Sequence, residues 1–419
     1  MKRSFADILA GLDGERAQKL ARKLPEWAAA GAEIPSALSL EQCSSTATAL
    51  YKTYVISASP DRQLLKVWVA TVLPQHCLLR SAEMTGTILD LTGGLGVDSW
   101  AFAQVAQRVV YFERDATLAA AAERNFARLG AGNIEVRCET VTPDTELPEA
   151  DLIYADPARR DAVGRKVFLL EDCTPDILTL LPMLLRKAPT VLLKLSPMAD
   201  LAMLADRLGA ALREIHVVEL DGEVKELLCL LQPDATPADL QIIITRLQNA
   251  ESLCFTPQEE RDAQAVYAAG VQPGEVLLEP CPALLKAGAF RLPCTRWGLR
   301  KLAPSTHLYL SPAPPGSKTP SSVPGNPVFT SPGSETAHSV PGSSFFKAWR
   351  VRETLPFGAA AFKELKRRYP RAEVTARNLP LGSEALRQKM GIAPGGDTHI
   401  FGCRLADGAA VLLVCEAIS

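Results

Sequence analysis

The chain has 419 residues, of which 47% are hydrophobic and 22% are charged. This length predicts two or three domains, and the composition is typical of a folded globular protein and excludes wholesale disorder. The 45 Lys and Arg nearly balance the 47 Asp and Glu, so any affinity for nucleic acid must come from a local basic face. We expect no membrane span and no signal peptide. The ten cysteines form no C-x-x-C pair, which predicts free thiols, a cytoplasmic protein and no metal site.

The first half of the chain contains two different patterns. Residues 1–80 have apolar positions every three or four residues, which predicts a helical N-terminal domain. Residues 81–235 alternate short apolar runs with helix-length segments, which predicts an open, mostly parallel sheet with helices on both faces. The last two apolar runs, 214–220 and 226–231, are separated by a segment too short for a crossover helix. The last strand is therefore predicted to be antiparallel.

The second half is predicted to contain three segments. Residues 236–310 are predicted to form a small α+β, ferredoxin-like module. Residues 311–344 are rich in Pro, Ser and Gly, which predicts a disordered insertion because such a composition cannot bury a core. Residues 345–419 again alternate strand-like and helix-like runs, and they are predicted to form a C-terminal α+β domain.

The first predicted strand of the parallel sheet ends in a glycine-rich turn that runs from Asp90 to Asp98. In an open α/β sheet, ligands bind beyond the carboxyl ends of the strands, and glycines let the backbone approach a ligand closely. The second strand ends at Glu113, whose carboxylate is placed to accept hydrogen bonds from ribose hydroxyls. Glu139 follows the third strand and either faces an adenine amino group or is a surface acid.

Two classes of cofactor use such a turn. A nicotinamide fingerprint, G-x-G-x-x-G, would need a glycine at position 99, which is Ser99, and Asp90 would repel a pyrophosphate. S-adenosylmethionine (SAM) has no phosphate and has a cationic methionine end, so an acid favours it. The turn is similar to the D-x-G-x-G-x-G turn of class I methyltransferases, with Thr92 at the first glycine. We therefore expect SAM to be held by Asp90, Thr92, Gly93, Gly94, Gly96, Asp98, Glu113 and Glu139.

The fourth strand ends at Asp156-Pro157, where class I methyltransferases acting on amino groups have (D/N)-P-P-(Y/F). In those enzymes the acidic or amide side chain and the next carbonyl accept hydrogen bonds from the target amino group. Ala158 and Arg159 replace the second proline and the stacking aromatic, so an arginine plane is expected to stack or to hold a phosphate, unless it is only solvated. Lys194, in the apolar fifth strand, is either functional or paired with an acid. The predicted catalytic set is Asp156, Pro157, Arg159 and Lys194.

Several of these motifs together resemble a bacterial family of class I SAM-dependent methyltransferases that carry a C-terminal THUMP-like domain. The resemblance is carried by the segments 38–45, 89–98, 156–161, 193–198, 225–228 and 279–289, and it covers nearly the whole chain except 311–344. It implies a Rossmann-like methyltransferase domain over 81–235 and a THUMP-like domain over 345–419. It also implies SAM as the cofactor and, through the THUMP-like domain, RNA as a partner.

The C-terminal domain is basic, because residues 345–419 contain twelve Lys and Arg against seven Asp and Glu, a net charge of +5. A cluster in one predicted helix is suited to phosphate contacts, although a solvated helix face would have the same pattern. With Arg160, this cluster gives the RNA-binding candidates Arg160, Lys363, Lys366, Arg367 and Arg368.

The resulting prediction is a cytoplasmic SAM-dependent methyltransferase that modifies a base nitrogen in structured RNA, such as tRNA or rRNA. Two alternatives remain open. One is a methyltransferase for a small molecule or a protein. The other is a non-catalytic protein that binds SAM or RNA, because Ala158 and Arg159 interrupt the usual acceptor motif.

Overall fold

The computed structural model describes residues 4–158, except 57–84, residues 170 and 173–312, and residues 343–418. These residues fall into two compact units, Met1–Thr256 and Pro257–Ser419. Most of the predicted disordered insertion, together with Arg159 and Arg160, lies outside the described residues.

Short helices form the N-terminal part of the first unit: α1 (Phe5–Ala10), α2 (Gly14–Lys23), α3 (Pro25–Ala29), α4 (Ala37–Gln42) and α5 (Thr46–Ile56). Trp27 and Leu50 are fully buried in the same hydrophobic core as Trp100 and Phe126, which belong to the sheet region. The helices therefore share a core with the sheet region and do not form the separate domain that we expected over residues 1–80. Helices this short cannot bury their apolar sides against one another alone.

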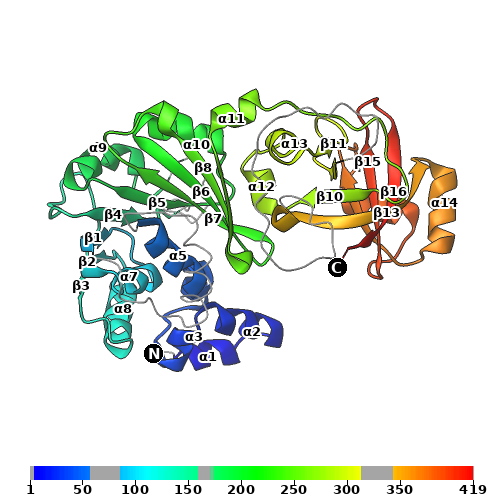
Figure 1. Ribbon diagram of the computed structural model, residues 1–419. Helices are drawn as coiled ribbons and strands as arrows, with labels where there is room; N and C mark the ends of the chain where they lie inside the picture. Colours follow the sequence, from blue (N-terminus) through cyan, green and yellow to red (C-terminus); the bar gives the residue numbers. More distant parts are fainter. Residues whose placement is uncertain (1–3, 57–84, 159–169, 171–172, 313–342, 419) are drawn as a thin grey trace, which may run out of the picture. The chain divides into compact units, whose positions relative to one another are not determined.

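The first unit is built on one large sheet, whose order in the described residues is β3-β2-β1-β4-β5-β7-β6-β8-β9 (Figure 1). Its strands are β1 (Thr85–Asp90), β2 (Ala106–Phe112), β3 (Ile134–Arg137), β4 (Leu152–Ala155), β5 (Val191–Leu195), β6 (Leu212–Leu220), β7 (Glu223–Leu231), β8 (Gln241–Arg246) and β9 (Glu251–Phe255). Strands β1 to β5 run parallel, and β7 is antiparallel to β5 and β6. The predicted Rossmann-like fold class is confirmed.

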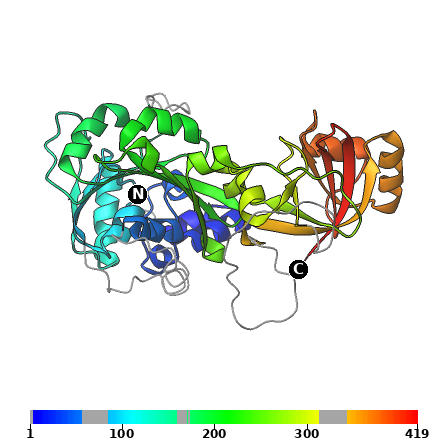
Figure 2. The same cartoon turned by 45° about the horizontal axis from the view of Figure 1, so that its top comes forward.

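Helices cover both faces of this sheet. Helices α5, α7 (Val97–Phe102) and α8 (Ala116–Arg128) lie on one face, and α9 (Ile177–Lys187) and α10 (Leu201–Leu208) lie on the other (Figures 1 and 2). The strand order changes direction between β1 and β4. In open α/β sheets this switch point opens a crevice at the carboxyl ends of the strands, which positions the site described below.

The first unit extends further along the chain than we expected. Strand β8 pairs with β6 and β9 pairs with β8, so the sheet continues past the predicted boundary at residue 235. Ile242, Ile243 and Ile244 are consecutive and all buried. A continuous apolar run of this kind is typical of a strand covered on both faces, which explains why it belongs to the large sheet.

The second unit contains another sheet, ordered β11-β12-β10-β13-β16-β15-β14 in the described residues. Its strands are β10 (Val276–Pro280), β11 (Arg300–Lys301), β12 (Tyr309–Leu310), β13 (Phe346–Pro356), β14 (Glu373–Arg377), β15 (Thr398–Arg404) and β16 (Ala410–Ala417). Because β10 pairs with β13, segments before and after the predicted insertion share one sheet. The segments 236–310 and 345–419, which we expected to form separate modules, therefore contribute strands to the same sheet.

Helices complete the second unit. Helices α11 (Pro257–Asp262), α12 (Pro282–Lys286) and α13 (Leu292–Trp297) precede β11, and α14 (Ala359–Arg368) and α15 (Ser383–Met390) follow β13. Leu365 and Leu386 of the last two helices pack on Ile400 and Leu412 of the sheet. No helix within the described ranges has both the length and the apolar character needed to cross a bilayer.

Candidate active site at the carboxyl ends of β1, β2 and β4

The glycine-rich turn after β1 is packed closely against β2. The Gly93 amide donates to the Phe112 carbonyl at 2.8 Å, and the Tyr111 hydroxyl donates to the Gly94 carbonyl at 2.6 Å. A Cβ on Gly93 would lie 2.0 Å from the Tyr111 ring, and Gly96 has a φ of +93°. Both positions therefore require glycine, one for space and one for backbone conformation.

The Asp90 side chain is buried beneath this turn. Its Oδ1 accepts from the Thr92 amide at 3.1 Å, and its Oδ2 accepts from the Ser99 hydroxyl at 2.6 Å. Burial raises the pKa of the Asp90 carboxyl to about 7, although both hydrogen bonds act to lower it. The carboxylates of Asp98 and Asp156 also raise this pKa. Asp90 therefore orders the turn and changes charge near neutral pH.

This raised pKa gives a testable pH dependence of stability. The pKa of Asp90 rises on folding from 3.8 to about 7, so between these values the native state holds a proton that the unfolded chain has lost. The contribution of Asp90 to the free energy of unfolding therefore decreases as the pH rises through this window. Relative to the wild type, Asp90→Asn should gain stability between about pH 4.5 and about pH 7.5, measured by urea unfolding. A stability difference that stays constant with pH would contradict this assignment.

A cavity of about 280 Å³ opens beside the turn. Of the predicted site residues, Thr92, Glu113, Glu139 and Asp156 line it. The Glu113 carboxylate is held by two backbone amides, since Gly94 donates to Oε2 and Asp115 donates to Oε1, both at 2.8 Å. The carboxyl ends of β1, β2 and β4 thus bring together side chains that are far apart in the sequence.

The composition of this cavity fits SAM. Apolar side chains of Leu91, Val141 and Leu180 line it beside the carboxylates of Glu113 and Glu139, a combination suited to an adenosine whose polar groups need acceptors. In its ionised form, the buried Asp90 carboxylate beneath the turn disfavours a phosphate and favours a cationic ligand. Among the described residues, no group of three or more His, Cys, Asp or Glu could hold a metal ion.

Asp98, which we expected to contact the cofactor, lies in a different environment. Its Oδ2 accepts from the hydroxyls of Ser44 and Tyr154, both at 2.8 Å, and its Oδ1 lies 3.2 Å from the Lys52 ammonium. Burial favours the protonated acid, but Lys52 and Lys194, together with the two hydroxyl hydrogen bonds, outweigh it and lower the pKa of Asp98. The side chain turns toward α5 because that helix carries its cationic partner. Asp98 therefore belongs to a buried polar network and is not among the residues that line the cavity.

The same network contains Lys52, a fully buried residue of α5 that the sequence did not lead us to select. Its ammonium lies 2.7 Å from Glu226 Oε1 and donates to the Ser44 hydroxyl at 3.2 Å. Burial raises the pKa of Glu226. The one sequence signal that could have identified Lys52 is a lone charge in an otherwise uncharged helix, as for Lys194 in its strand.

Lys194, on β5, forms an ion pair with Asp156. Burial alone would favour the neutral amine, but the carboxylates of Asp156, Asp98 and Glu226 outweigh it, so the pKa of Lys194 is raised. Lys194 is therefore a permanent cation at neutral pH. We expected Lys194 to be either functional or paired with an acid. The acid partner is present, and it is Asp156, the residue expected to orient the methyl acceptor.

Thr92 connects the cofactor turn to the Asp-Pro loop. Its hydroxyl accepts from the Asp156 amide at 2.6 Å, which explains why a side chain is useful at this usual glycine position. The loop is also anchored further along, since Ala158 and Thr174 exchange backbone hydrogen bonds at 2.8 and 3.0 Å. Pro157 is buried between these anchors. Hydrogen bonds therefore tie residues 156–158 both to the glycine-rich turn and to Thr174.

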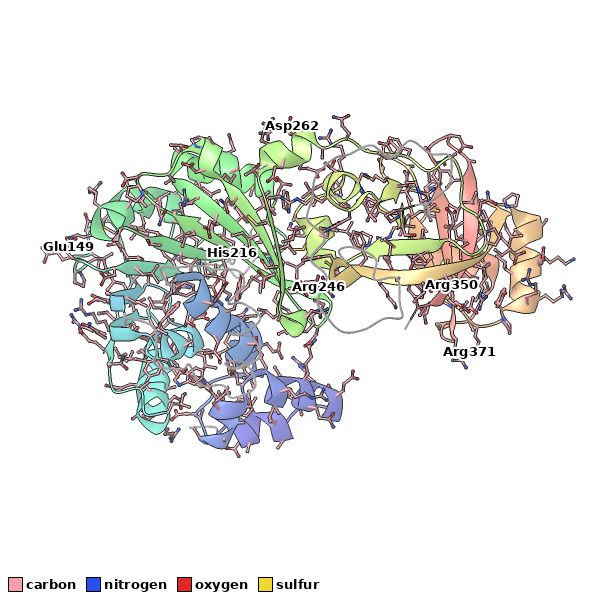
Figure 3. The ribbon with its side chains drawn as sticks, in the orientation of Figure 1. Glu149, His216, Arg246, Asp262, Arg350 and Arg371 are labelled. Carbon is pink, nitrogen blue, oxygen red and sulfur yellow. The ribbon has the colours of Figure 1, made fainter. Side chains whose placement is uncertain are left out.

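The basic cluster of the second unit lies on α14, where Lys363, Lys366, Arg367 and Arg368 are all exposed. Arg368 is held by Glu353 at 2.8 Å and by Glu364 at 3.1 Å, so its charge is compensated. Arg371 follows this helix and points away from the body of the unit (Figure 3). Within the described ranges, the cluster that remains uncompensated is Lys363, Lys366 and Arg367.

Comparison with known proteins identifies relatives of both units. A THUMP domain-like family model matches residues 346–417, and a ferredoxin-like domain model matches residues 277–315. A search of curated proteins finds no match. Among solved structures, a candidate methyltransferase from Porphyromonas gingivalis W83 is 32% identical, and the alignment covers 100% of this chain and 95% of that one with a TM-score of 0.74.

Two further solved structures align with a smaller part of the chain. An rRNA methylase from Streptococcus thermophilus is 13% identical over 36% of this chain and 87% of its own, with a TM-score of 0.27. A candidate methyltransferase from Streptococcus mutans, in complex with S-adenosylhomocysteine, is 10% identical over 36% of this chain and 89% of its own, with a TM-score of 0.28. The Porphyromonas protein, aligned along both units, is thus the relative that identifies the family.

Proposed function

The chain belongs to the family of class I SAM-dependent methyltransferases that carry a C-terminal THUMP-like domain, with SAM as cofactor, and from this we propose that it methylates RNA in the cytoplasm. The observation that carries the RNA proposal is the C-terminal unit. Its THUMP-like segment has a net charge of +5 over residues 345–419, and α14 presents Lys363, Lys366 and Arg367 to solvent. An exposed basic cluster supports contacts with phosphates.

We assign the cofactor contacts to the first unit. SAM supplies a methyl group made electrophilic by its sulfonium. We propose that Glu113 accepts from the ribose hydroxyls, that Glu139 accepts from the adenine amino group, and that the Gly93–Gly96 turn above Asp90 holds the cationic methionine end. Because Thr92 ties this turn to Asp156, the same contacts that fix the cofactor also fix the acceptor loop.

Asp156 is the residue that we propose for orienting the acceptor. Its carboxylate lies at the cavity, its backbone amide donates to the Thr92 hydroxyl, and its side chain forms an ion pair with Lys194. The Asp156-Pro157 sequence favours a base nitrogen as the acceptor, as predicted above, with Pro157 shaping the loop. Roles for Arg159 and Arg160 in stacking and in phosphate binding remain predictions.

The experiment that tests this function uses the full chain, labelled SAM and total RNA from cells in which the gene has been deleted. Deletion matters because a site that is already fully methylated in the cell cannot take up the label. We expect RNA-dependent incorporation of label. Label found only in protein or small molecules would favour those substrates, and SAM binding without any transfer would favour a non-catalytic role.

Charge reversal of the exposed cluster on α14 should weaken RNA binding. Changing Lys363, Lys366 and Arg367 to Glu removes cations that bind phosphates, so we expect the affinity for RNA to fall at least about tenfold. The slope of log affinity against log salt should become shallower by about 0.7–0.9 for each phosphate that is no longer neutralised. Fluorescence anisotropy with labelled RNA at several salt concentrations measures both quantities. The affinity for SAM should not change.

The matched control carries the same change of charge in the first unit. Lys19, Arg22 and Arg186 are also outside the core, and their reversal to Glu should leave RNA affinity closer to the wild-type value. Equal losses in both triple variants would show that only total charge matters. An affinity insensitive to salt and to the α14 reversal would remove the support for RNA as the substrate.

A further inference from the structure

Two lysines and two carboxylates from separate elements meet near the carboxyl ends of β4 and β5. Lys52 comes from α5, Asp156 follows β4, Lys194 is on β5 and Glu226 is on β7. Lys52 lies 2.7 Å from Glu226, and Lys194 pairs with Asp156. Lys194 is opposite Leu228 in the antiparallel ladder, so Glu226 is its diagonal neighbour on the same face of the sheet. The four side chains therefore form one cluster.

One pair of side chains in this cluster is more deeply buried than the other. The side chains of Lys52 and Glu226 are 0% and 3% exposed, whereas those of Lys194 and Asp156 are 12% and 36% exposed. Asp156 also lines the cavity in which we place the cofactor. Substrate can thus reach the Lys194–Asp156 pair, and Lys52 and Glu226 support that pair from within the protein.

We propose that the Lys52–Asp156–Lys194–Glu226 cluster directs methyl transfer to a hydroxyl group, namely the ribose 2′-OH of RNA. This rests on the proposed methylation of RNA, and it replaces the base nitrogen that the Asp156-Pro157 sequence favours as the acceptor atom. The charge of Lys194 is the first reason. A nitrogen acceptor becomes positively charged as it takes the methyl group, and the Lys194 ammonium would oppose that charge. A hydroxyl oxygen instead develops negative charge as it loses its proton, and an ammonium placed there stabilises it.

The acceptor loop is the second reason. Enzymes that modify a base take it out of its stack and hold it against an aromatic or apolar side chain. Where amino-methylating enzymes have a second proline and the stacking aromatic, this chain has the small, exposed Ala158 and then Arg159, which is not an aromatic. Asp156 also does not offer a free carboxylate to an amino group, because Lys194 already binds Oδ2. A ribose hydroxyl needs no stacking partner and needs one oxygen of the carboxylate.

The step balances with these groups alone. The hydroxyl oxygen forms a bond to the methyl carbon while the carbon–sulfur bond breaks, and the electron pair of that bond remains on sulfur. The hydroxyl proton passes to the Asp156 carboxylate, and the Lys194 ammonium stabilises the charge on the oxygen. Lys52 and Glu226 act as positioning residues, since they reach the substrate only through this pair.

The product identifies the acceptor directly. Total RNA from cells lacking the gene is methylated with labelled SAM by the full chain and then hydrolysed with alkali. A 2′-O-methyl group blocks cleavage of the adjacent phosphodiester, so we expect the label in alkali-stable dinucleotides. Label in mononucleotides that carry a methylated base would overturn the hydroxyl inference and leave the RNA function intact. Absence of label from RNA would overturn the RNA function itself.

Variants test the cluster. Lys194→Met should lower kcat by at least about 100-fold, Lys194→Arg should retain more activity, and the affinity of both for SAM should stay within about twofold.

Removal of the Lys52 cation raises the pKa of the carboxylates near it, so Lys52→Met should move the acidic limb of the pH–rate profile to higher pH. A loss that is uniform across the pH range would contradict the positioning role.

A measurement without catalysis completes the test. If Lys52→Met fails to fold, a pH titration of the Lys194 side chain in the wild type by NMR still decides, because the proposal requires Lys194 to be cationic without SAM or RNA. We expect its ammonium signal to persist beyond about pH 10, near the ordinary pKa of a lysine. Deprotonation near neutral pH would remove the group that stabilises the oxygen and would overturn the inference.

Discussion

Replacing Asp156 with asparagine is expected to lower kcat for methyl transfer by a factor of about 10³, the scale of loss seen when a group that handles a proton in the transition state is removed. Asparagine has the same size, but it cannot accept a proton from the acceptor and cannot neutralise Lys194. Affinities for SAM and RNA should stay within about threefold, because the role of Asp156 is exerted during the reaction. Single-turnover kinetics and calorimetry separate the two effects.

A matched control lies in the same cavity. Asp176 also lines it, but its carboxylate caps α9 by accepting from the Thr179 amide at 3.2 Å, a role that asparagine can fill. Asp176→Asn should therefore keep nearly full activity. Since Asp156 is 36% exposed, its replacement should cost well below the roughly 3–5 kcal/mol of a broken buried pair. Full activity in Asp156→Asn would show that Asp156 does not orient or deprotonate the methyl acceptor.

The positions of the cavity residues followed from the order of elements. Asp90, Glu113 and Asp156 each end or follow a predicted strand of a parallel sheet, and the carboxyl ends of such strands meet at one edge. The structure brings Glu113 and Asp156 to one cavity with Asp90 beneath the adjoining turn. This part of the site was predictable because local strand and turn signals determine it.

The charged cluster could not be predicted in this way. Lys52 and Glu226 are distant in the sequence, and they meet because α5 packs across the sheet through Tyr51 and Val55. Most residues of α5 are buried, polar ones included, so its own sequence pattern does not indicate which face packs on the sheet. The same packing determines the direction of the Asp98 side chain, which was expected to contact the cofactor but turns to Lys52. A single charged residue in an otherwise uncharged helix or strand indicates a buried ion pair, but it does not indicate which residue is the partner.

Domain boundaries were the other feature that composition did not determine. The Pro-, Ser- and Gly-rich segment marks a change of composition, yet β10 before it and β13 after it pair in one sheet. Likewise β8 and β9 follow a short break in pattern and still extend the large sheet. Composition identifies segments that cannot build a core, whereas sheet membership depends on pairing between distant strands.

Replacing Glu113 with alanine is expected to weaken SAM binding by roughly 10- to 150-fold, measured by calorimetry. Hydrogen bonds to a charged acceptor contribute about 1.5–3 kcal/mol, and each 1.4 kcal/mol is a tenfold change in affinity. The loss has two sources. The ribose hydroxyls would lose their carboxylate acceptor, and the Gly94 and Asp115 amides would lose the partner that shapes the turn.

Glu113→Gln separates these two sources, because an amide oxygen can still accept from one backbone amide but carries no charge. We expect its affinity for SAM to lie between those of Glu113→Ala and the wild type. Glu149→Ala is the control, since Glu149 is an exposed acid of the same unit that pairs with Lys187, 3.0 Å away, and it does not line the cavity (Figure 3). If Glu113→Ala binds SAM with wild-type affinity, Glu113 does not contact the ribose of SAM. Equal losses in Glu113→Gln and Glu113→Ala would mean that charge, and not the shape of the turn, dominates cofactor binding.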